Sequence, residues 1–233
     1  ICLLLLEKVF LVLAEAALET VPPEIQGHPA VVKDAERRGK KPGQILLDRS
    51  YHHFAMKKLP DAEKRGRPDI VHFCLLEALG SPLNQANKLE TYVSTRGGLV
   101  IYVNPCVRLP RVYDRFKGVV EKLFAEGEIR SETGEMLLRC EKKSLKSLTE
   151  SLNPSTKILL TEKGEYVNAL GFSAALAGHA RPLIMVGCFP HGDFTSETKA
   201  LADKSLAIHK TPLEAWTIVS RVLCYIEQNL IPL

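Results

Sequence analysis

The stretch LIMVGCFPHGDF, residues 183–194, decides the fold class. It starts as a continuous apolar run, which is typical of a strand buried on both faces of a parallel sheet. The run passes directly into a loop that contains Gly187, Pro190 and Gly192. Loops that leave the carboxyl ends of parallel strands are where α/β proteins bind small ligands. The glycine spacing matches neither the Rossmann nor the Walker fingerprint, so a ligand loop and an ordinary tight turn both stay open.

Similar apolar segments alternate with helical patterns along the chain, which predicts an α/β protein with a mostly parallel sheet. Helices are predicted at 68–79, 110–126 and 212–230, and each of them begins at a proline. Strands are predicted at VFLVL (9–13), QILLD (44–48), ETYVST (90–95), GLVIYVN (98–104), KILLT (157–161), LIMVGCF (183–189) and SLAIH (205–209).

One pair of strands has a different pattern. In ETYVSTRGGLVIYVN, residues 90–104, two alternating β-branched segments flank Arg96-Gly97-Gly98, which is a hairpin signal. This predicts one antiparallel hairpin inserted in the parallel sheet. The charged segment KDAERRGKKPGQ, residues 33–44, is predicted to be a mobile surface loop.

Composition excludes little beyond the extreme classes. The chain has 45% hydrophobic and 25% charged residues and a net charge of +4, which is typical of a soluble globular protein and does not by itself predict a nucleic-acid partner. The six cysteines form no C-x-x-C pair, so we predict a reducing compartment and no metal site. The opening ICLLLLEKVFLVL lacks a basic leader and contains Glu7 and Lys8, so we predict neither a signal peptide nor a membrane span.

The first basic cluster is NPCVRLPRVYDRFKG, residues 104–118. A helix that opens at Pro110 would place arginines near its N-terminal end, where the helix dipole disfavours cations. On such a helix Arg111 and Arg115 share a face, and Tyr113 could stack on a base. The arginines of the cluster are Arg108, Arg111 and Arg115.

The second basic cluster, EKRGRPDIVH, residues 63–72, repeats this arrangement at Pro68. Asp69 falls in the first turn of the predicted helix and can pair with Arg67. A solvated charged surface explains either cluster alone. Two such clusters in one chain favour an anionic ligand, and arginine binds phosphate through its planar fork. We therefore predict that both clusters bind a nucleic-acid backbone.

Four motifs together resemble the nucleolar-essential-protein family: RGRPDIVHFCLLEALGSPLN, VNPCVRLPRVYDRFKGVVEKLF, VGCFPHG and LAIHKTPLEAWTI. Members are SPOUT-class methyltransferases that modify N1 of pseudouridine in small-subunit ribosomal RNA. The resemblance covers most of the chain and implies an α/β knot, a C-terminal trefoil knot, in one domain over residues 1–233 with family-specific insertions within roughly 20–110. It also implies S-adenosylmethionine as cofactor and a homodimer in which residues 212–230 pack against the partner. The lack of long extensions is similar to archaeal members, which implies a cytoplasmic protein, whereas a eukaryotic member would be nucleolar.

The resemblance also implies roles for individual residues. Gly187 and Gly192 would border the cofactor, and Thr161 would lie near the third knot loop. Arg67 would contact the RNA, and Asp69 would orient it; Asp69 and solvent are the candidate acceptors of the substrate proton. The residues that would line the adenine and ribose are Ser205, Leu206, Ala207, Ile208, His209 and Lys210. The residues that would bind the RNA backbone and target loop are Arg108, Arg111 and Arg115.

Two other functions remain open at this point. A non-catalytic assembly factor of the small ribosomal subunit would use the same basic clusters with an inactive cofactor pocket. A SPOUT enzyme that acts on transfer RNA would share the knot. Cofactor binding tests the first alternative, and a panel of RNA substrates tests the second.

Overall fold

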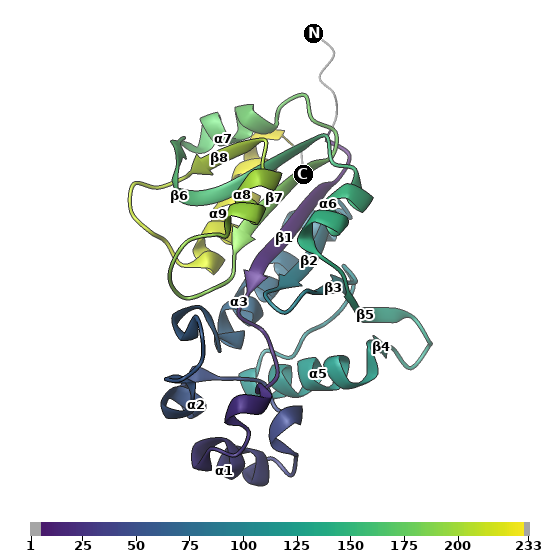
Figure 1. The fold of residues 1–233 in the computed structure, drawn as a ribbon. Helices are drawn as coiled ribbons and strands as arrows, with labels where there is room; N and C mark the ends of the chain where they lie inside the picture. The colour runs from purple at the N-terminus through teal and green to yellow at the C-terminus, as the bar shows by residue number, and fades with distance from the viewer. Residues whose placement is uncertain (1–5, 231–233) are drawn as a thin grey trace.

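The computed structural model describes residues 6–230, which form one mixed sheet with helices on both faces (Figure 1). The strands are β1 (Val9–Ala16), β2 (Leu89–Thr95), β3 (Leu99–Val103), β4 (Glu128–Arg130), β5 (Met136–Lys142), β6 (Thr156–Tyr166), β7 (Pro182–Gly187) and β8 (Lys204–Ala207). Their order across the sheet is β4-β5-β3-β2-β1-β7-β6-β8. The strands from β2 to β8 in this order run parallel, and β3, β5 and β4 form an antiparallel edge.

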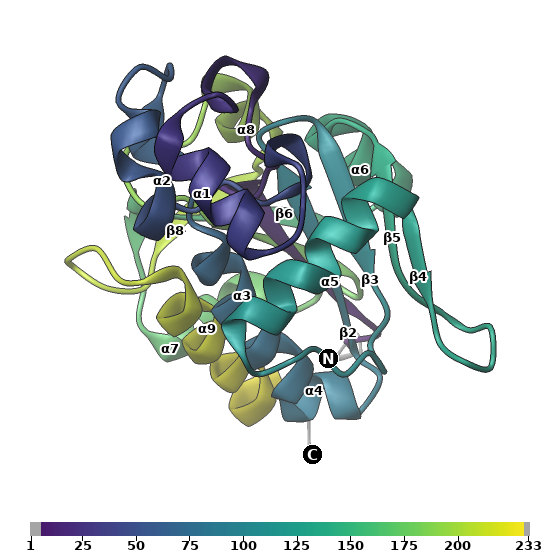
Figure 2. The same ribbon diagram turned by 90° about the horizontal axis from the view of Figure 1, so that it is seen from below.

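The helices divide between the two faces of the sheet, as Figure 2 shows from below. They are α1 (Pro29–Arg37), α2 (Arg49–Met56), α3 (Pro68–Gly80), α4 (Pro82–Gln85), α5 (Tyr113–Glu126), α6 (Leu145–Leu152), α7 (Ala169–Leu176), α8 (Ser196–Leu201) and α9 (Ala215–Leu230). Helices α3, α4, α5, α7 and α9 pack on one face, and α6 and α8 on the other. The ligand-binding edge of such a sheet lies at the carboxyl ends of its parallel strands.

Strand β1 explains why the sequence shows continuous apolar runs. Leu11 and Leu13 point into the core under α3 and α9, whereas Phe10 and Val12 point into the core under α6 and α8. Because both faces of the strand are covered, alternation with polar residues is absent. The predicted first strand, the hairpin of β2 and β3, and the helix at 68–79 are confirmed.

Residues 20–66 form a small unit that lies at the end of the molecule beyond the sheet (Figure 1). It contains α1, α2 and the short 3-10 turns Pro23–Ile25, Pro42–Gln44 and Ala62–Lys64. Its own hydrophobic core consists of Val21, Ile25, Val31, Ala35, Ile45, Leu47, Ala55, Met56 and Leu59.

Two predictions within this unit are wrong. The segment 44–48 is not a strand, because Gln44 ends a 3-10 turn and Leu46 forms no more than an isolated bridge, to Thr20. The apolar pattern arises because Ile45 and Leu47 are buried in the small core. The segment 33–44 is not an irregular surface loop. Its first part belongs to α1, because Val31 and Ala35 form a buried stripe one helical turn apart.

The antiparallel edge is larger than predicted. Strand β5 pairs with β3, and β4 pairs with β5, beyond the one predicted hairpin. These strands are mostly half-buried or exposed, so they lack the apolar run that marks the central strands.

Two helices begin three residues after the predicted proline. Helix α5 begins at Tyr113, and α9 begins at Ala215. The carbonyl of Pro110 accepts a hydrogen bond from the ring Nε2 of His72 at 2.7 Å, so the chain there packs against α3 as an irregular segment. Arg111 therefore precedes the helix, and the prediction that Arg111 and Arg115 share a helix face is wrong.

Within residues 6–230, no helix combines the length and the apolar character that crossing a bilayer requires. The first part of the apolar opening, residues 1–5, lies outside the described residues, as do residues 231–233.

Candidate functional site

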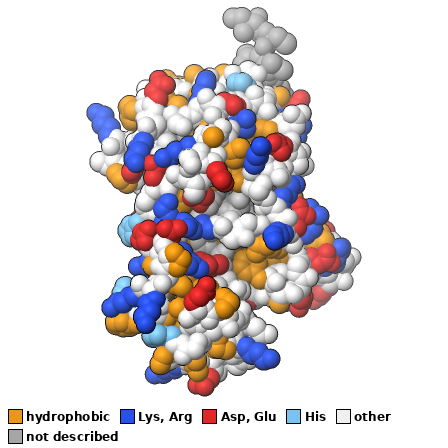
Figure 3. Space-filling view, viewed as in Figure 1, with side chains coloured by type: hydrophobic (Ala, Val, Ile, Leu, Met, Phe, Trp, Pro, Cys, Tyr) orange, Lys and Arg blue, Asp and Glu red, His pale blue; other side chains and the backbone are white. Residues whose placement is uncertain are grey.

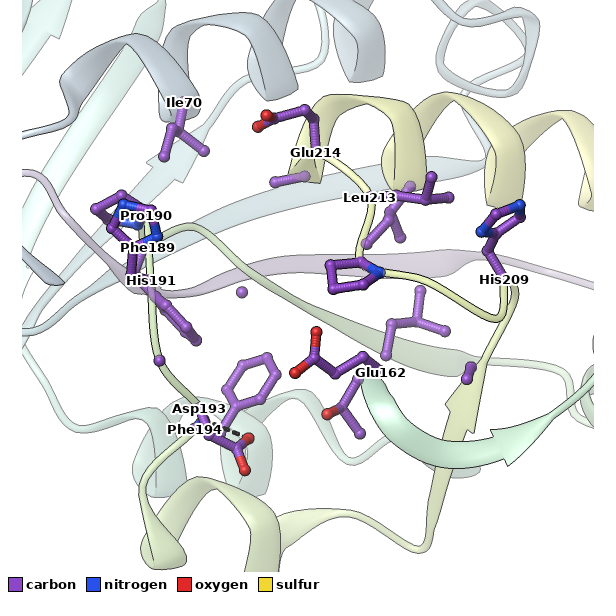
Figure 4. Close-up of a pocket in the computed structure, with 18 of the residues that line it drawn as sticks. Ile70, Glu162, Phe189, Pro190, His191, Asp193, Phe194, His209, Leu213 and Glu214 are labelled. Carbon is purple, nitrogen blue, oxygen red and sulfur yellow. Dashed lines mark hydrogen bonds between the residues drawn. The ribbon is translucent and has the colours of Figure 1, made fainter. Parts of the chain in front are cut away.

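A cavity of about 240 Å³ opens at the carboxyl ends of β6, β7 and β8 (Figure 4). Strand β6 supplies residues 160–162, and the loop after β7 supplies residues 189–194. The end of β8 and the segment from it to the first residue of α9 supply residues 206–209 and 211–215. The predicted ligand loop therefore meets two further strand ends at one place, as expected for a parallel sheet.

Close packing of glycines shapes the loop after β7. A Cβ atom on Gly187 would lie 2.8 Å from the ring of Phe189 and 2.9 Å from the ring of Phe194. Gly192 has a φ of +90°, and a Cβ there would lie 2.6 Å from Cε of Lys64. Because Gly187 has no side chain, the two aromatic rings can pack over the end of β7. Gly192 suits its position because glycine tolerates a positive φ and leaves room for Lys64.

Strand β6 curves around β8 at the cavity. Leu206 pairs with Leu160 and again with Glu165, so the residues between them bulge past it. Gly164 lies at this crossing, where a Cβ would stand 2.6 Å from the backbone of Leu206. The backbone of β8 can approach β6 this closely only because Gly164 has no side chain.

Ionic contacts fasten the same loop to its surroundings. The carboxylate of Asp193 accepts hydrogen bonds from Lys163 at 2.8 Å and from Lys199 at 2.7 Å. These bonds lower the pKa of Asp193 to about 2. Lys64 donates to the carbonyl oxygen of Asp193 and lies over the ring of Phe189. The loop is thus held in place at its tip.

The exit of the loop is tied to β1. Both the backbone N–H and the hydroxyl of Thr195 donate to Glu15 at 2.8 Å, and the Thr195 side chain also caps α8. The backbone of Cys188 bonds Ala14 and Ala17 at the end of β1. These hydrogen bonds attach the cavity wall to β1, a central strand of the sheet.

The walls of the cavity combine apolar and polar groups, and its carboxylates outnumber its one arginine, Arg67. Leu160, Leu206 and Ile218 provide apolar surface. Figure 4 shows Glu162 and Glu214 on opposite walls, with Glu214 next to Ile70. This combination suits a flat heteroaromatic ligand that also carries positive charge, and two carboxylates disfavour a phosphate.

Most of the residues predicted to hold a cofactor line this cavity. Thr161, Gly187, Gly192, Leu206, Ala207, Ile208 and His209 do so. Ser205 and Lys210 are exposed and are not among the lining residues. Sequence reasoning missed Phe189, Phe194, Glu162 and Glu214. Glu214 could have been predicted from the sequence, because it lies in the loop that follows HKTP, residues 209–212.

Arg67 stands at the edge of the cavity, where it is the N-cap residue of α3. Its Nε and Nη2 atoms donate to the two carboxylate oxygens of Asp69, each at 2.8 Å. The hydrogen bond to Asp69 raises the pKa of Arg67. The predicted pairing is confirmed, and it fixes the guanidinium at the cavity mouth.

The arginines of the first cluster lie beside α3. Arg108, Arg111 and Arg115 are exposed, and none of them forms an ion pair with a carboxylate among residues 6–230. The segment is held by His72, whose ring bonds the Pro110 carbonyl and stacks on Phe116 with 4.3 Å between centroids. These exposed, unpaired cations next to α3 form a surface that attracts an anionic ligand.

A buried ionic network supports this surface from below. Asp48 accepts hydrogen bonds from Lys117 Nζ at 3.1 Å and from the Tyr113 hydroxyl at 2.9 Å. Lys117 and His52 are fully buried. Burial, and then Asp48, raise the pKa of the Tyr113 hydroxyl, so it remains a donor. Tyr113 is thereby committed to the network rather than free to stack on a base.

A second buried carboxylate, that of Glu121, lies where α5 packs against residues 20–66. The carboxylate of Glu121 accepts hydrogen bonds from Arg38 and Lys40, each at 2.6 Å, and from the backbone of Leu46 at 2.8 Å. Residues 20–66 are thus joined to α5 through the buried carboxylate of Glu121 and two partly exposed cations. No sequence pattern indicated these pairs, because the partners lie far apart in the chain.

The fold and the site define an α/β protein that binds a small ligand at the ends of its parallel strands, next to an arginine-rich surface. A family model described as EMG1/NEP1 methyltransferase matches residues 11–227. The chain belongs to this family.

Curated relatives agree over nearly the whole chain. The Ribosomal RNA small subunit methyltransferase Nep1 of Thermococcus kodakarensis is 48% identical over 220 residues, which cover 94% of this chain and 98% of the relative. The protein of the same name from Pyrococcus furiosus is 44% identical over 225 residues, covering 97% and 99%. A crystal structure of Archaeoglobus fulgidus Nep1 bound to S-adenosylhomocysteine is similar with a TM-score of 0.85 and 43% identity, and covers 96% of this chain and 98% of that one.

Proposed function

We propose that this protein is an S-adenosylmethionine-dependent methyltransferase that methylates N1 of a pseudouridine in small-subunit ribosomal RNA, in ribosome biogenesis. The observation that carries the proposal is the cavity at the ends of β6, β7 and β8, which has the guanidinium of Arg67 at its edge. The family and the names of the relatives support the same activity. The similar structure with S-adenosylhomocysteine supports the cofactor.

The chemistry of the cavity fits S-adenosylmethionine. The adenine ring requires flat apolar walls, which Leu206 and Ile208 offer at the end of β8. The ligand also carries a positive sulfonium and an ammonium group, and Glu162 and Glu214 supply two carboxylates. Because Gly187 and Gly192 have no side chains, the loop after β7 can pack closely along the cavity. When bound, S-adenosylmethionine supplies an electrophilic methyl group.

We assign the binding roles accordingly. Gly187, Gly192 and Thr161 border the cofactor, and the stretch from Ser205 to Lys210 holds its nucleoside through backbone groups and apolar side chains. Ser205 and Lys210 contribute the least, since their side chains are exposed outside the cavity lining.

The RNA lies on the basic side. Arg67 contacts the target nucleotide, and Arg108, Arg111 and Arg115 bind the backbone of the target loop. Arg67 lies at the N-terminal end of α3. Arg108 and Arg111 lie in the irregular segment before α5, and Arg115 lies in the first turn of α5. A looped-out base suits this arrangement because RNA sequence is read mainly where bases are unstacked.

Arg67 serves the reaction through its charge. Pseudouridine has a proton on N1, because its sugar is attached through carbon, and this proton must leave as the N–C bond forms. A guanidinium beside the base stabilises the deprotonated ring by opposite charge. Both oxygens of Asp69 are occupied by Arg67, so Asp69 positions that side chain, and water takes the proton.

The finer features of the family belong to the same proposal. The segment after β8 passes through the loop after β7 as a trefoil knot, and the tight crossing of β6 and β8 at Gly164 supports it. The protein acts as a homodimer in which α9 packs against its partner. It works in the cytoplasm, where an archaeal ribosome is assembled.

The decisive experiment measures methyl transfer from labelled S-adenosylmethionine to two matched RNA hairpins that carry pseudouridine or uridine in the loop. Transfer to the pseudouridine hairpin alone is expected. No transfer to either hairpin, despite tight binding of both, would favour the assembly-factor function instead. The role of Arg67 is tested by the pH–rate profile of Arg67→Ala, which should shift to higher pH relative to wild type; an unshifted profile contradicts it.

A further inference from the structure

Helix α2 exposes a surface of aromatic and basic side chains that the proposed reaction does not use. We call it the α2 face; it consists of Tyr51, His53 and Phe54 of the helix and of Lys57 and Lys58 directly after its end, all exposed. Figure 3 shows hydrophobic, histidine and basic side chains side by side over this part of the molecule. The segment from Arg49 to Pro60 contains no acidic residue. The face is therefore positive as well as aromatic.

Phe54 is the centre of the face. Its side chain is 69% exposed, although burying a phenylalanine normally stabilises a protein. The ammonium of Lys57 lies 5.0 Å from the centre of the ring, and His53 meets the ring edge-on at 5.5 Å. Phe54 is thus held among cationic and imidazole groups rather than in an apolar patch. Within residues 6–230, neither Lys57 nor Lys58 forms an ion pair with a carboxylate.

Tyr51, one helical turn before Phe54, is already occupied. The guanidinium of Arg37 lies 4.7 Å from its ring, and Lys117 Nζ lies 4.5 Å from it. Phe54 has only one cation over its ring among the described residues, Lys57, and is more exposed than Tyr51, so it is the better stacking surface. Tyr51 instead fixes the helix against the buried network around Lys117.

The α2 face is rigidly connected to the cavity. The backbone N–H of Arg49 donates to the carbonyl of Gly66 at 2.8 Å, directly before Arg67. Met56 packs against Gly66, where a Cβ would lie 2.9 Å from its terminal methyl group. Asp48, the N-cap of α2, also binds Tyr113 of the arginine segment. These contacts fix the start of α2 to the residue that precedes Arg67 and to the arginine segment.

We propose that the α2 face is a second RNA contact, in which Phe54 stacks on an unpaired base outside the target loop and Lys57 and Lys58 bind the adjoining phosphates. Positive grooves with exposed aromatic rings bind single-stranded RNA in this way. A protein partner would match a contiguous apolar patch, whereas here the contacts of the Phe54 ring are with Lys57 and His53. The inference rests on the proposed function only in taking RNA as the substrate.

The test compares two labelled RNAs by fluorescence anisotropy. One is the target hairpin with an unpaired tail, and the other is the same RNA with its tail paired to a complementary strand, which hides the base faces. Phe54→Ala should weaken binding of the unpaired RNA roughly ten-fold and leave the paired RNA within about two-fold. Phe54→Trp should retain tight binding, and Phe54→Leu should not, because leucine keeps apolar area without a ring. Replacing Lys57 and Lys58 by alanine should reduce the slope of log affinity against log salt by about 0.7 for each lysine.

Controls separate this inference from general damage and from the proposed function. Leu170→Ala removes a side chain that is 68% exposed on α7 and should change neither affinity. Cofactor binding by each variant confirms that the cavity is intact. Equal binding of the unpaired RNA by wild type and Phe54→Ala overturns the inference, as does an equal loss for both RNAs. If no variant, wild type included, methylates the hairpin but binding still depends on Phe54, then the proposed function fails and the second RNA contact stands.

Discussion

The cavity and the basic surface are built from different parts of the chain: backbone at strand ends in the first, charged side chains in the second. The cavity is formed by strand ends, the loops that follow them and glycines at close crossings, such as Gly164 against β8. The basic surface is formed by side chains, and the ionic network of Asp48 and Lys117 holds it in place from the interior. Backbone contacts determine the shape of the cavity, whereas charged side chains determine the electrostatic potential of the basic surface. The two regions should therefore respond differently to substitution and to pH.

The largest effect is expected on the basic side, from Lys117→Met. Lys117 is fully buried against Asp48, which is also buried, so removing the cation leaves an uncompensated charge in the interior. Breaking such a pair costs about 3–5 kcal/mol. We expect the free energy of unfolding in urea to fall by that amount, while cofactor affinity at low temperature stays within about two-fold.

The matched control is Lys122→Met on the same helix. Lys122 and its partner Glu126 are both more than half exposed, at 59% and 56%. An exposed pair contributes less than about 1 kcal/mol. Similar losses in both variants would mean that the buried network does not support the basic surface.

The next effect is expected on the cavity side, from Gly164→Ala. The new Cβ would stand 2.6 Å from the backbone of Leu206, and backbone cannot move aside as a flexible side chain can. We expect a loss of about 3 kcal/mol in unfolding free energy, at the upper end for inserting a single carbon. Calorimetric titration should show cofactor affinity reduced by at least about ten-fold, with RNA affinity less affected.

Gly118→Ala is the control on the basic side. Gly118 lies within α5, and a Cβ there would meet nothing within 4 Å. Alanine in a helix interior is favoured over glycine by up to about 1 kcal/mol. Gly118→Ala should therefore be neutral or stabilising. A cofactor affinity that is equal in both glycine variants would contradict the role assigned to the crossing at Gly164.

The same contrast explains what the sequence could predict. The central strands were predictable because burial on both faces leaves an apolar run, and the arginines because they stand out beside prolines. The segment QILLD misled for the same reason: Ile45 and Leu47 are buried, but in the small core of residues 20–66 rather than in the sheet. Apolar runs report burial and not the partner that provides it.

The buried network and the meeting of the two cavity carboxylates could not be predicted. Lys117 appears in the sequence as one more charge on an amphipathic helix, and its partner Asp48 lies 69 residues away. Glu162 and Glu214 reach the same cavity from β6 and from the start of α9. Such pairings arise only when distant segments meet, so no local pattern records them.

A smaller effect is expected where the two regions meet, from Asp69→Asn. The change preserves shape but removes the charge that orients Arg67 through two bonds of 2.8 Å. A charge-assisted bond contributes about 1.5 kcal/mol or more. We expect RNA affinity to fall about ten-fold while cofactor affinity is unchanged, as measured by anisotropy and calorimetric titration. Asp61→Asn, which loosens the exposed pair with Arg96, should leave both affinities unaltered.

The smallest effect is the dependence of folding stability on pH. The two regions should lose stability in different pH ranges. On the basic side, burial lowers the pKa of His52, so its neutral form is favoured in the folded protein and stability falls as the pH drops below about 6.5. On the cavity side, hydrogen bonds from Lys163 and Lys199 hold the pKa of Asp193 at about 2, below the value of ~3.9 for an unfolded aspartate. The contribution of Asp193 is therefore present above about pH 4 and is lost as the pH falls toward 2.

These two ranges predict an order of acid weakening that amide exchange can measure, once rates are corrected for the intrinsic effect of pH. Between pH 6.5 and 5, residues 20–66 should lose protection while the loop after β7 keeps it; below pH 4 the loop should follow. Asp193→Asn should lower stability by less than about 1 kcal/mol at pH 6, because Lys163 and Lys199 are 66% and 45% exposed, and the difference from wild type should shrink at pH 3. Loss of protection in both regions over the same pH range would show that one cooperative unit spans them, and that the basic surface and the cavity are not stabilised separately.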